Sequence, residues 1–164
     1  MLVGDDAAPE WWFYHLSRTS LELAIAPLMQ KCLDRGWRAL IVSPHARRRA
    51  DLDRILWTWA DASFLPHGDA EAAGLDPSRQ PVLISETCEN ENNADVIVLL
   101  DGTSMPAGAP CRRCMVVFDG ADRATRAVAR DQYKSAGSSG CKVRYFQQSP
   151  KGGWQEANTQ QAQG

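Results

Sequence analysis

The chain has 164 residues, of which 44% are hydrophobic and 23% are charged. This length suits one domain, the apolar content excludes a disordered chain, and no apolar run approaches the roughly 18 residues of a membrane-spanning helix. With 18 basic and 20 acidic side chains, the net charge of −2 gives no general reason to expect a nucleic-acid-binding protein. The balance hides a split, because residues 1–120 sum to −6 and residues 121–164 sum to +4.

The N-terminal segment and the cysteines bear on the cellular compartment. The first ten residues are acidic and polar, so they lack the basic start and apolar stretch of a signal peptide. A small secreted domain usually carries an even and dense set of cysteines, whereas this chain has five scattered ones. We therefore predict a cytoplasmic protein with reduced thiols and no membrane association.

Short apolar runs alternate with helical patterns along most of the chain. The first run, at 11–16, is aromatic-rich and precedes a helix that Ser20 caps and Gly36 ends, with Leu23 among its apolar positions. Pro27 lies inside this helix and is expected to kink or split it. Further elements are predicted as helices at 46–60 and 121–138 and as strands at 37–42, 81–85, 95–100, 115–118 and 141–146.

Nearly continuous apolar strands that alternate with helices predict an α/β domain. We expect three layers, α/β/α, with a mostly parallel sheet that resembles a nucleotide-binding fold. Residues 1–148 are predicted to form this single domain. From 149 to 164 the chain is polar and rich in Gly and Gln, so we expect a disordered tail apart from Trp154.

No phosphate loop accompanies this fold. The first strand-to-helix turn, at 15–20, contains no glycine, and neither the dinucleotide fingerprint nor the Gly-Lys-Ser/Thr pattern occurs in the chain. Asp101 and Asp119 each follow an apolar strand, as do metal-binding carboxylates of nucleotide hydrolases, although such an Asp is more often a turn or cap residue. A degenerate nucleotide-binding enzyme that uses Asp101 or Asp119 with a divalent metal is therefore an alternative hypothesis.

Cysteine and histidine form no complete catalytic or metal-binding set in the sequence. Cys111 and Cys114 have the CxxC spacing, but they precede a strand rather than open a helix, and zinc requires four ligands. His15, His45 and His67 have no nucleophile motif around them. We predict no cofactor and no catalytic residue, and we interpret Cys111 and Cys114 as free thiols.

Basic side chains form a stripe on the predicted helix 121–138. At 100° per residue they fall within about 80° of one another, with Tyr133 at the edge of the stripe and with Ala124 and Val128 opposite, facing the core. The stripe consists of Arg123, Arg126, Arg130 and Lys134. A solvated basic face is the simplest interpretation, while the adjoining Tyr favours an anionic peptide with an apolar or aromatic group. Direct binding of single-stranded DNA is a third hypothesis.

Aromatic residues gather at the end of the predicted helix 46–60. Trp57 and Trp59 differ by about 200° on a helix, so they cannot both face the core, and one of them is expected to be exposed. Phe64, Leu65 and Pro66 follow within ten residues. Trp and Phe are favoured anchors at protein interfaces, although core packing accounts for part of this cluster.

Several of these stretches together resemble a known family. The segment from Leu52 to Trp57, followed by Ser-Phe-Leu-Pro-His at 63–67, is similar to the most characteristic stretch of the bacterial DNA polymerase III chi subunit family. Supporting matches occur in the same order over residues 11–148, at Phe13-Tyr14, Gly36-Trp37-Arg38, Gln80-Pro81-Val82 and Tyr133-Lys134. The family leads us to expect another basic residue near Gly137, which is absent, and the loops 86–93 and 102–114 match no family feature.

The resemblance implies a non-catalytic accessory subunit of the clamp-loader complex in DNA polymerase III holoenzyme. Family members bind the acidic, Phe-terminated C-terminal tail of single-stranded-DNA-binding protein, so the link to DNA is indirect, and they also bind the psi subunit. Carried over by position, the tail site would comprise Arg126, Arg130, Tyr133 and Lys134. The surface for psi, or for a substitute protein such as a helicase, would comprise Trp57, Phe64 and Pro66.

Overall fold

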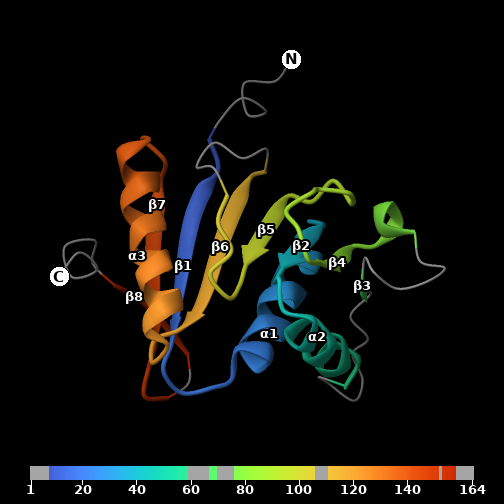
Figure 1. The fold of residues 1–164 in the computed structure, drawn as a ribbon, viewed down its shortest axis with the longest axis horizontal. Coiled ribbons are helices and arrows are strands. Elements are labelled where there is room, and N and C mark those ends of the chain that lie inside the picture. The colour runs from blue at the N-terminus through green and yellow to red at the C-terminus, as the bar shows by residue number, and fades with distance from the viewer. Residues whose placement is uncertain (1–7, 59–66, 70–75, 106–110, 152, 158–164) are drawn as a thin grey trace.

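A mostly parallel sheet forms the centre of the computed structural model, which describes residues 8–58, 67–69, 76–105, 111–151 and 153–157 (Figure 1). The strands are β1 Glu10–Leu16, β2 Ala39–Val42, β3 His67–Asp69, β4 Val82–Ser85, β5 Val96–Leu99, β6 Arg113–Asp119, β7 Val143–Gln148 and β8 Trp154–Ala157. The helices are α1 Leu21–Asp34, α2 Ala46–Thr58, the 3-10 helix η2 Pro77–Arg79 and α3 Arg123–Ser138.

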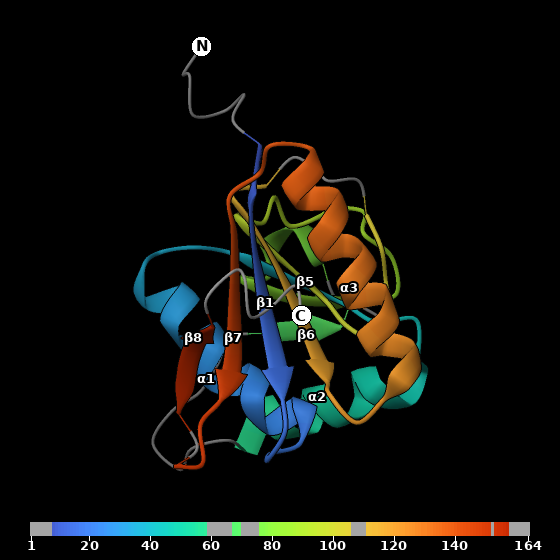
Figure 2. The ribbon, with the colours of Figure 1, turned by 90° about the vertical axis from the view of Figure 1, so that its left-hand side faces the viewer.

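The strand order is β3-β4-β2-β5-β6-β1-β7-β8, and all pairs are parallel except β7 with β8. Side chains alternate between the two faces of the sheet. Leu52 and Leu56 of α2 pack with α1 on one face, whereas Ala129 and Ala136 of α3 pack on the other. Figure 2 shows α3 and α1 on opposite sides of the sheet. The predicted three-layer α/β fold is therefore confirmed.

Helix α1 begins as predicted but is not broken by its proline. The Ser20 hydroxyl accepts a hydrogen bond from the Leu23 amide at 3.3 Å, and the helix continues without a break through Pro27 to Asp34. Leu23, one of the apolar positions of the predicted helix, is 49% exposed.

Two strands lie where no strand was predicted. β3 is a three-residue strand that lies between the predicted helix 46–60 and the predicted strand 81–85, and it pairs with β4. β8 lies inside the segment 149–164, so the prediction of a disordered tail, which excepted Trp154, is wrong for residues 155–157. Phe146 pairs with Glu156 in this hairpin, and Trp154 packs edge-on against Tyr14 at 5.0 Å, which gives the polar strand an apolar anchor.

Candidate functional site

The edge of the sheet at which nucleotide-binding folds hold phosphate is filled here by a protein side chain. After β1, the backbone N–H groups of Ser17, Arg18 and Thr19 donate to Gln148 Oε1 at 2.9, 2.7 and 3.2 Å. Gln148 Nε2 donates to the Thr19 hydroxyl at 2.8 Å. Successive N–H groups that converge on one acceptor are the arrangement that binds anions in phosphate loops. In this chain the glutamine amide occupies that position.

The two aspartates of the enzyme hypothesis both have structural contacts. Asp101 accepts from the Ser43 hydroxyl at 2.6 Å and pairs with Arg48 at 3.0 Å. Burial raises the pKa of Asp101, but hydrogen bonds from Arg48 and Ser43 outweigh it and lower the pKa overall. Asp119 accepts from the amide of Ala121 at 2.9 Å, which makes it a turn residue. No group of three potential metal ligands occurs among the residues that the structure describes.

The basic stripe on α3 is exposed and borders the buried side of the helix. Arg126, Arg130 and Lys134 are all exposed. The core-facing positions are Ala129, Gln132, Tyr133 and Ala136. The prediction that Ala124 and Val128 face the core is therefore wrong, since Ala124 is exposed and Val128 is only partly buried. The helix is rotated so that the stripe and the buried face adjoin, and Tyr133 lies on the buried side of that boundary.

An aromatic cluster lies beneath the stripe. The Tyr133 ring contacts Phe13 and Tyr145 at centroid distances of 5.4 and 6.0 Å. The Tyr145 hydroxyl and His15 Nδ1 are 2.8 Å apart. Burial raises the pKa of Tyr145, and the positive charges of Arg126 and Arg130 oppose that rise, so both cations act on the phenol. The structure thus brings Arg126, Arg130, Tyr133 and Tyr145 together, with Lys134 further along the same exposed stripe, and we call this group of five the α3–β7 face.

Sequence reasoning did not identify Tyr145 or His15 as members of this neighbourhood. The register of β1 with β7, in which Phe13 pairs with Tyr145, brings them beside α3. Burial lowers the pKa of His15, and the nearby charge of Arg126 lowers it further, while Asp119 acts in the opposite direction. The aromatic character of residues 145 and 146 was the signal in the sequence, but the facing partner of a strand cannot be determined without its register.

The candidate surface for a second protein is described only in part. Trp57 is 51% exposed near the C-terminal end of α2. This exposure confirms that one tryptophan of the pair at 57 and 59 faces outward. Phe64 and Pro66, like Trp59, lie outside the described residues.

Cys111 and Cys114 lie close together as free thiols. Their sulfur atoms are 3.4 Å apart, and Cys114 Sγ also lies 3.7 Å from the sulfur of Met105. The hydrogen bond between the thiols lowers the pKa of Cys111 and raises that of the more deeply buried Cys114. The pair lies at the start of β6 rather than at a helix N-terminus.

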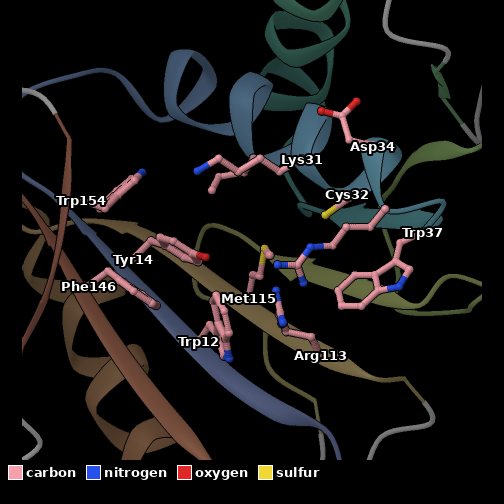
Figure 3. Close-up of a pocket in the computed structure, with 12 residues that line it drawn as sticks. Trp12, Tyr14, Lys31, Cys32, Asp34, Trp37, Arg113, Met115, Phe146 and Trp154 are labelled. Carbon is pink, nitrogen blue, oxygen red and sulfur yellow. The ribbon is translucent and has the colours of Figure 1, made fainter.

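A pocket of about 390 Å³ opens on the face of the sheet opposite α3, between α1 and the strands β1, β6, β7 and β8. Its walls carry several aromatic rings and positively charged side chains, and sequence reasoning did not predict it (Figure 3). The contributing residues come from segments far apart in the chain, so no local pattern indicates it.

Comparison with known proteins identifies the family. A family model described as DNA polymerase III chi subunit, HolC, matches residues 9–144. The chain belongs to the DNA polymerase III chi subunit family. A probable DNA polymerase III subunit chi from Rickettsia prowazekii (strain Madrid E) is 29% identical over 105 residues, which cover 64% of this chain and 62% of that relative. The family resemblance inferred from the motifs is thereby confirmed, and the chain is assigned to an accessory subunit family of DNA replication.

The fold occurs in proteins with little sequence similarity. The C-terminal domain of Dbp5 from S. cerevisiae superposes with a TM-score of 0.50 at 12% identity, covering 85% of this chain and 90% of that one. This similarity bears on the fold alone. None of the described helices combines the length and apolar character that a membrane span requires.

Proposed function

We propose that the chain is a non-catalytic, cytoplasmic subunit that links the DNA polymerase III clamp-loader complex to single-stranded-DNA-binding protein. It does so by binding the acidic, Phe-terminated tail of that protein at the α3–β7 face. Family membership supports the assignment to the polymerase complex. The observation that carries the tail site is the packing of Tyr133, on the same helix as the exposed Arg126 and Arg130, against the ring of Tyr145.

This arrangement matches the chemistry of such a tail. Guanidinium groups pair with carboxylates in charge-assisted hydrogen bonds, and an arginine or Lys134 holds the terminal carboxylate. The phenylalanine ring of the tail then packs at the aromatic boundary formed by Tyr133 and Tyr145. Exposed charges mainly set the association rate and its salt sensitivity, whereas the ring and the terminal carboxylate set the affinity.

The split in charge along the chain is consistent with an indirect link to DNA. The segment 1–120 is acidic and repels phosphate backbones, while the segment that contains α3 is basic. Because the DNA-binding partner presents several tails, modest affinity for one tail is multiplied when more than one is engaged.

Removal of the terminal phenylalanine from a tail peptide tests this function. The peptide with the phenylalanine is expected to bind saturably to the full chain, with an affinity that falls as salt is added. The shortened peptide is expected to bind at least about 10-fold more weakly, because it loses a buried ring. Fluorescence anisotropy of labelled peptides measures both affinities, and equal binding of the two peptides would reject the proposed mode.

A second surface, centred on Trp57, is proposed to hold the psi subunit or a protein that substitutes for it. Phe64 and Pro66 belong to this proposed surface through the family resemblance. Large exposed apolar side chains are favoured interface anchors, and the 51% exposure of Trp57 is the structural support.

Substitution of Trp57 by Ala is expected to weaken binding of psi by about 30-fold or more, since truncation of an anchor typically costs about 2 kcal/mol or more. Stability should fall by about 1–2 kcal/mol, because about half of the indole surface is buried against the protein. Leu23→Ala is the matched control, since Leu23 is similarly exposed, at 49%, on α1. Titration calorimetry and thermal melts give both quantities, and an unchanged affinity in Trp57→Ala would remove Trp57 from the interface.

A further inference from the structure

The pocket beneath α1 contains a buried arginine that forms no ion pair with the described residues. Arg113, at the start of β6, is only 8% exposed, and its Nε has no hydrogen-bond acceptor within the described part of the chain. Its guanidinium lies over the Trp12 ring at 3.5 Å and over Trp37 at 4.9 Å from the centroid. Figure 3 shows Arg113 between these two rings. We call this cavity the α1 pocket.

A second guanidinium adds to the positive charge at this end of the pocket. The guanidinium of Arg35, at the end of α1, lies over the ring of Trp37, 5.1 Å from its centroid. Burial lowers the pKa of Arg113, and the charge of Arg35 lowers it further, against the opposing charge of Glu10. Described ion pairs of arginine involve Arg48, Arg49, Arg54, Arg112 and Arg144, so neither Arg35 nor Arg113 is among them.

A buried guanidinium, Arg113, and an exposed one, Arg35, at the same end of the pocket favour an anionic ligand. A buried charge with an unsatisfied donor carries a desolvation penalty that an oxyanion offsets. The described side chains that line the pocket include three cations, Lys31, Arg35 and Arg113, and one carboxylate, Asp34. Their net charge of +2 matches a phosphate monoester, which carries about −1.5 to −2 near pH 7, better than it matches a single carboxylate.

The other end of the pocket is aromatic. Tyr14 stacks on Phe146 with centroids 5.0 Å apart and an interplanar angle of 14°, and Trp154 meets Tyr14 edge-on. In Figure 3 these three rings lie together on the side of the pocket away from Trp37. Such rings stack with nucleobases whatever their sequence. The volume of about 390 Å³ lies in the usual range for small-ligand sites.

We propose that the α1 pocket binds a 5′-phosphorylated nucleotide, with its phosphate between Arg35 and Arg113 and its base against the partly buried rings of Phe146 and Trp154, behind which Tyr14 is buried. Planar guanidinium groups donate hydrogen bonds to the oxygens of a phosphate. The rings of Trp12 and Trp37 already hold the two guanidinium groups in place. The site lies on the opposite face of the sheet from α3, so it is independent of the tail site. It also differs from the usual nucleotide position, which Gln148 fills.

Titration of the full chain with thymidine 5′-monophosphate, followed by calorimetry, tests the site. The nucleotide is expected to bind saturably, and thymidine or inorganic phosphate alone at least about 10-fold more weakly, because each lacks one half of the ligand. Arg35→Gln and Arg113→Gln are each expected to reduce affinity at least 10-fold. Arg47→Gln, an exposed arginine on α2, is the matched control and should bind as the unsubstituted chain does.

Arg35→Gln keeps the test decisive if the buried substitution at Arg113 impairs folding, because the Arg35 side chain is exposed. A 5′-phosphorylated thymidine oligonucleotide distinguishes the two sources of the ligand. Equal binding of the oligonucleotide assigns the pocket to a strand end, and binding of the mononucleotide alone assigns it to free nucleotide. Absence of saturable nucleotide binding, full affinity in Arg35→Gln, or displacement of the nucleotide by the Phe-terminated tail peptide would each overturn the proposal.

Discussion

Reversal of charge at both Arg126 and Arg130 is expected to reduce the affinity for the tail peptide by about 100-fold or more. Two glutamates facing an acidic peptide replace attraction with repulsion, and like charges placed together at an interface cost several kcal/mol, of which about 2.7 kcal/mol corresponds to 100-fold. Both side chains are exposed, so the fold should tolerate the change. Anisotropy titration gives the affinity, and a thermal melt verifies folding.

The matched control for this experiment carries the same change of charge elsewhere. Arg47 and Arg54 are exposed on α2, which packs on the opposite face of the sheet from α3. Arg47→Glu with Arg54→Glu should leave tail binding within a few-fold of the unsubstituted chain, with the remaining effect screened by salt. Equal losses in the two double variants would mean that net charge, and not the α3–β7 face, governs binding.

Substitution of Gln148 by Ala is expected to destabilise the protein by about 2–4 kcal/mol. The side chain is nearly buried and makes four hydrogen bonds, three from consecutive amides and one to Thr19. Each such hydrogen bond contributes about 0.5–1.5 kcal/mol. The backbone N–H groups that lose their acceptor add a desolvation penalty. Chemical denaturation measures the loss.

Gln147→Ala is the matched control, because Gln147 is the neighbouring residue of the same type and is exposed. Its effect should stay below about 0.5 kcal/mol, as for most surface substitutions. If the two variants were equally stable, the closure of the β1–α1 turn by Gln148 would not contribute to folding. Added inorganic phosphate that restored the stability of Gln148→Ala would show the turn acting again as an anion site.

Much of the scaffold follows from patterns within single elements. The apolar runs and the cap at Ser20 predict most of the strands and the start of α1, because a buried strand and a helix N-terminus each leave a local signature. The orientation of α3 was harder to predict. Its buried side includes Gln132 and Tyr133, whose polarity conceals them from a pattern that searches for apolar positions.

The parts that sequence reasoning missed are long-range. Gln148 meets residues about 130 positions away, and no local rule indicates that a glutamine at the end of β7 accepts hydrogen bonds from the amides of the β1–α1 turn. Likewise, Arg113 precedes the apolar part of β6 and resembles an exposed flanking charge, but Trp12 of β1 and Trp37, between α1 and β2, enclose it. The grouping of Arg126, Arg130, Tyr133 and Lys134 came from the family resemblance and helical periodicity. The contact of Tyr133 with Phe13 and Tyr145 could not be predicted without the register of β1 with β7.

The most direct test of the central claim is to locate the bound tail on the chain. Spectra that correlate amide nitrogen and hydrogen, recorded as unlabelled Phe-terminated peptide is added to isotope-labelled full chain, report each amide separately. We predict saturable shifts that are largest along Arg126 to Lys134 and at Tyr145. Shifts confined to the α1 pocket, or no saturable change at all, would contradict the assignment of the α3–β7 face as the tail site.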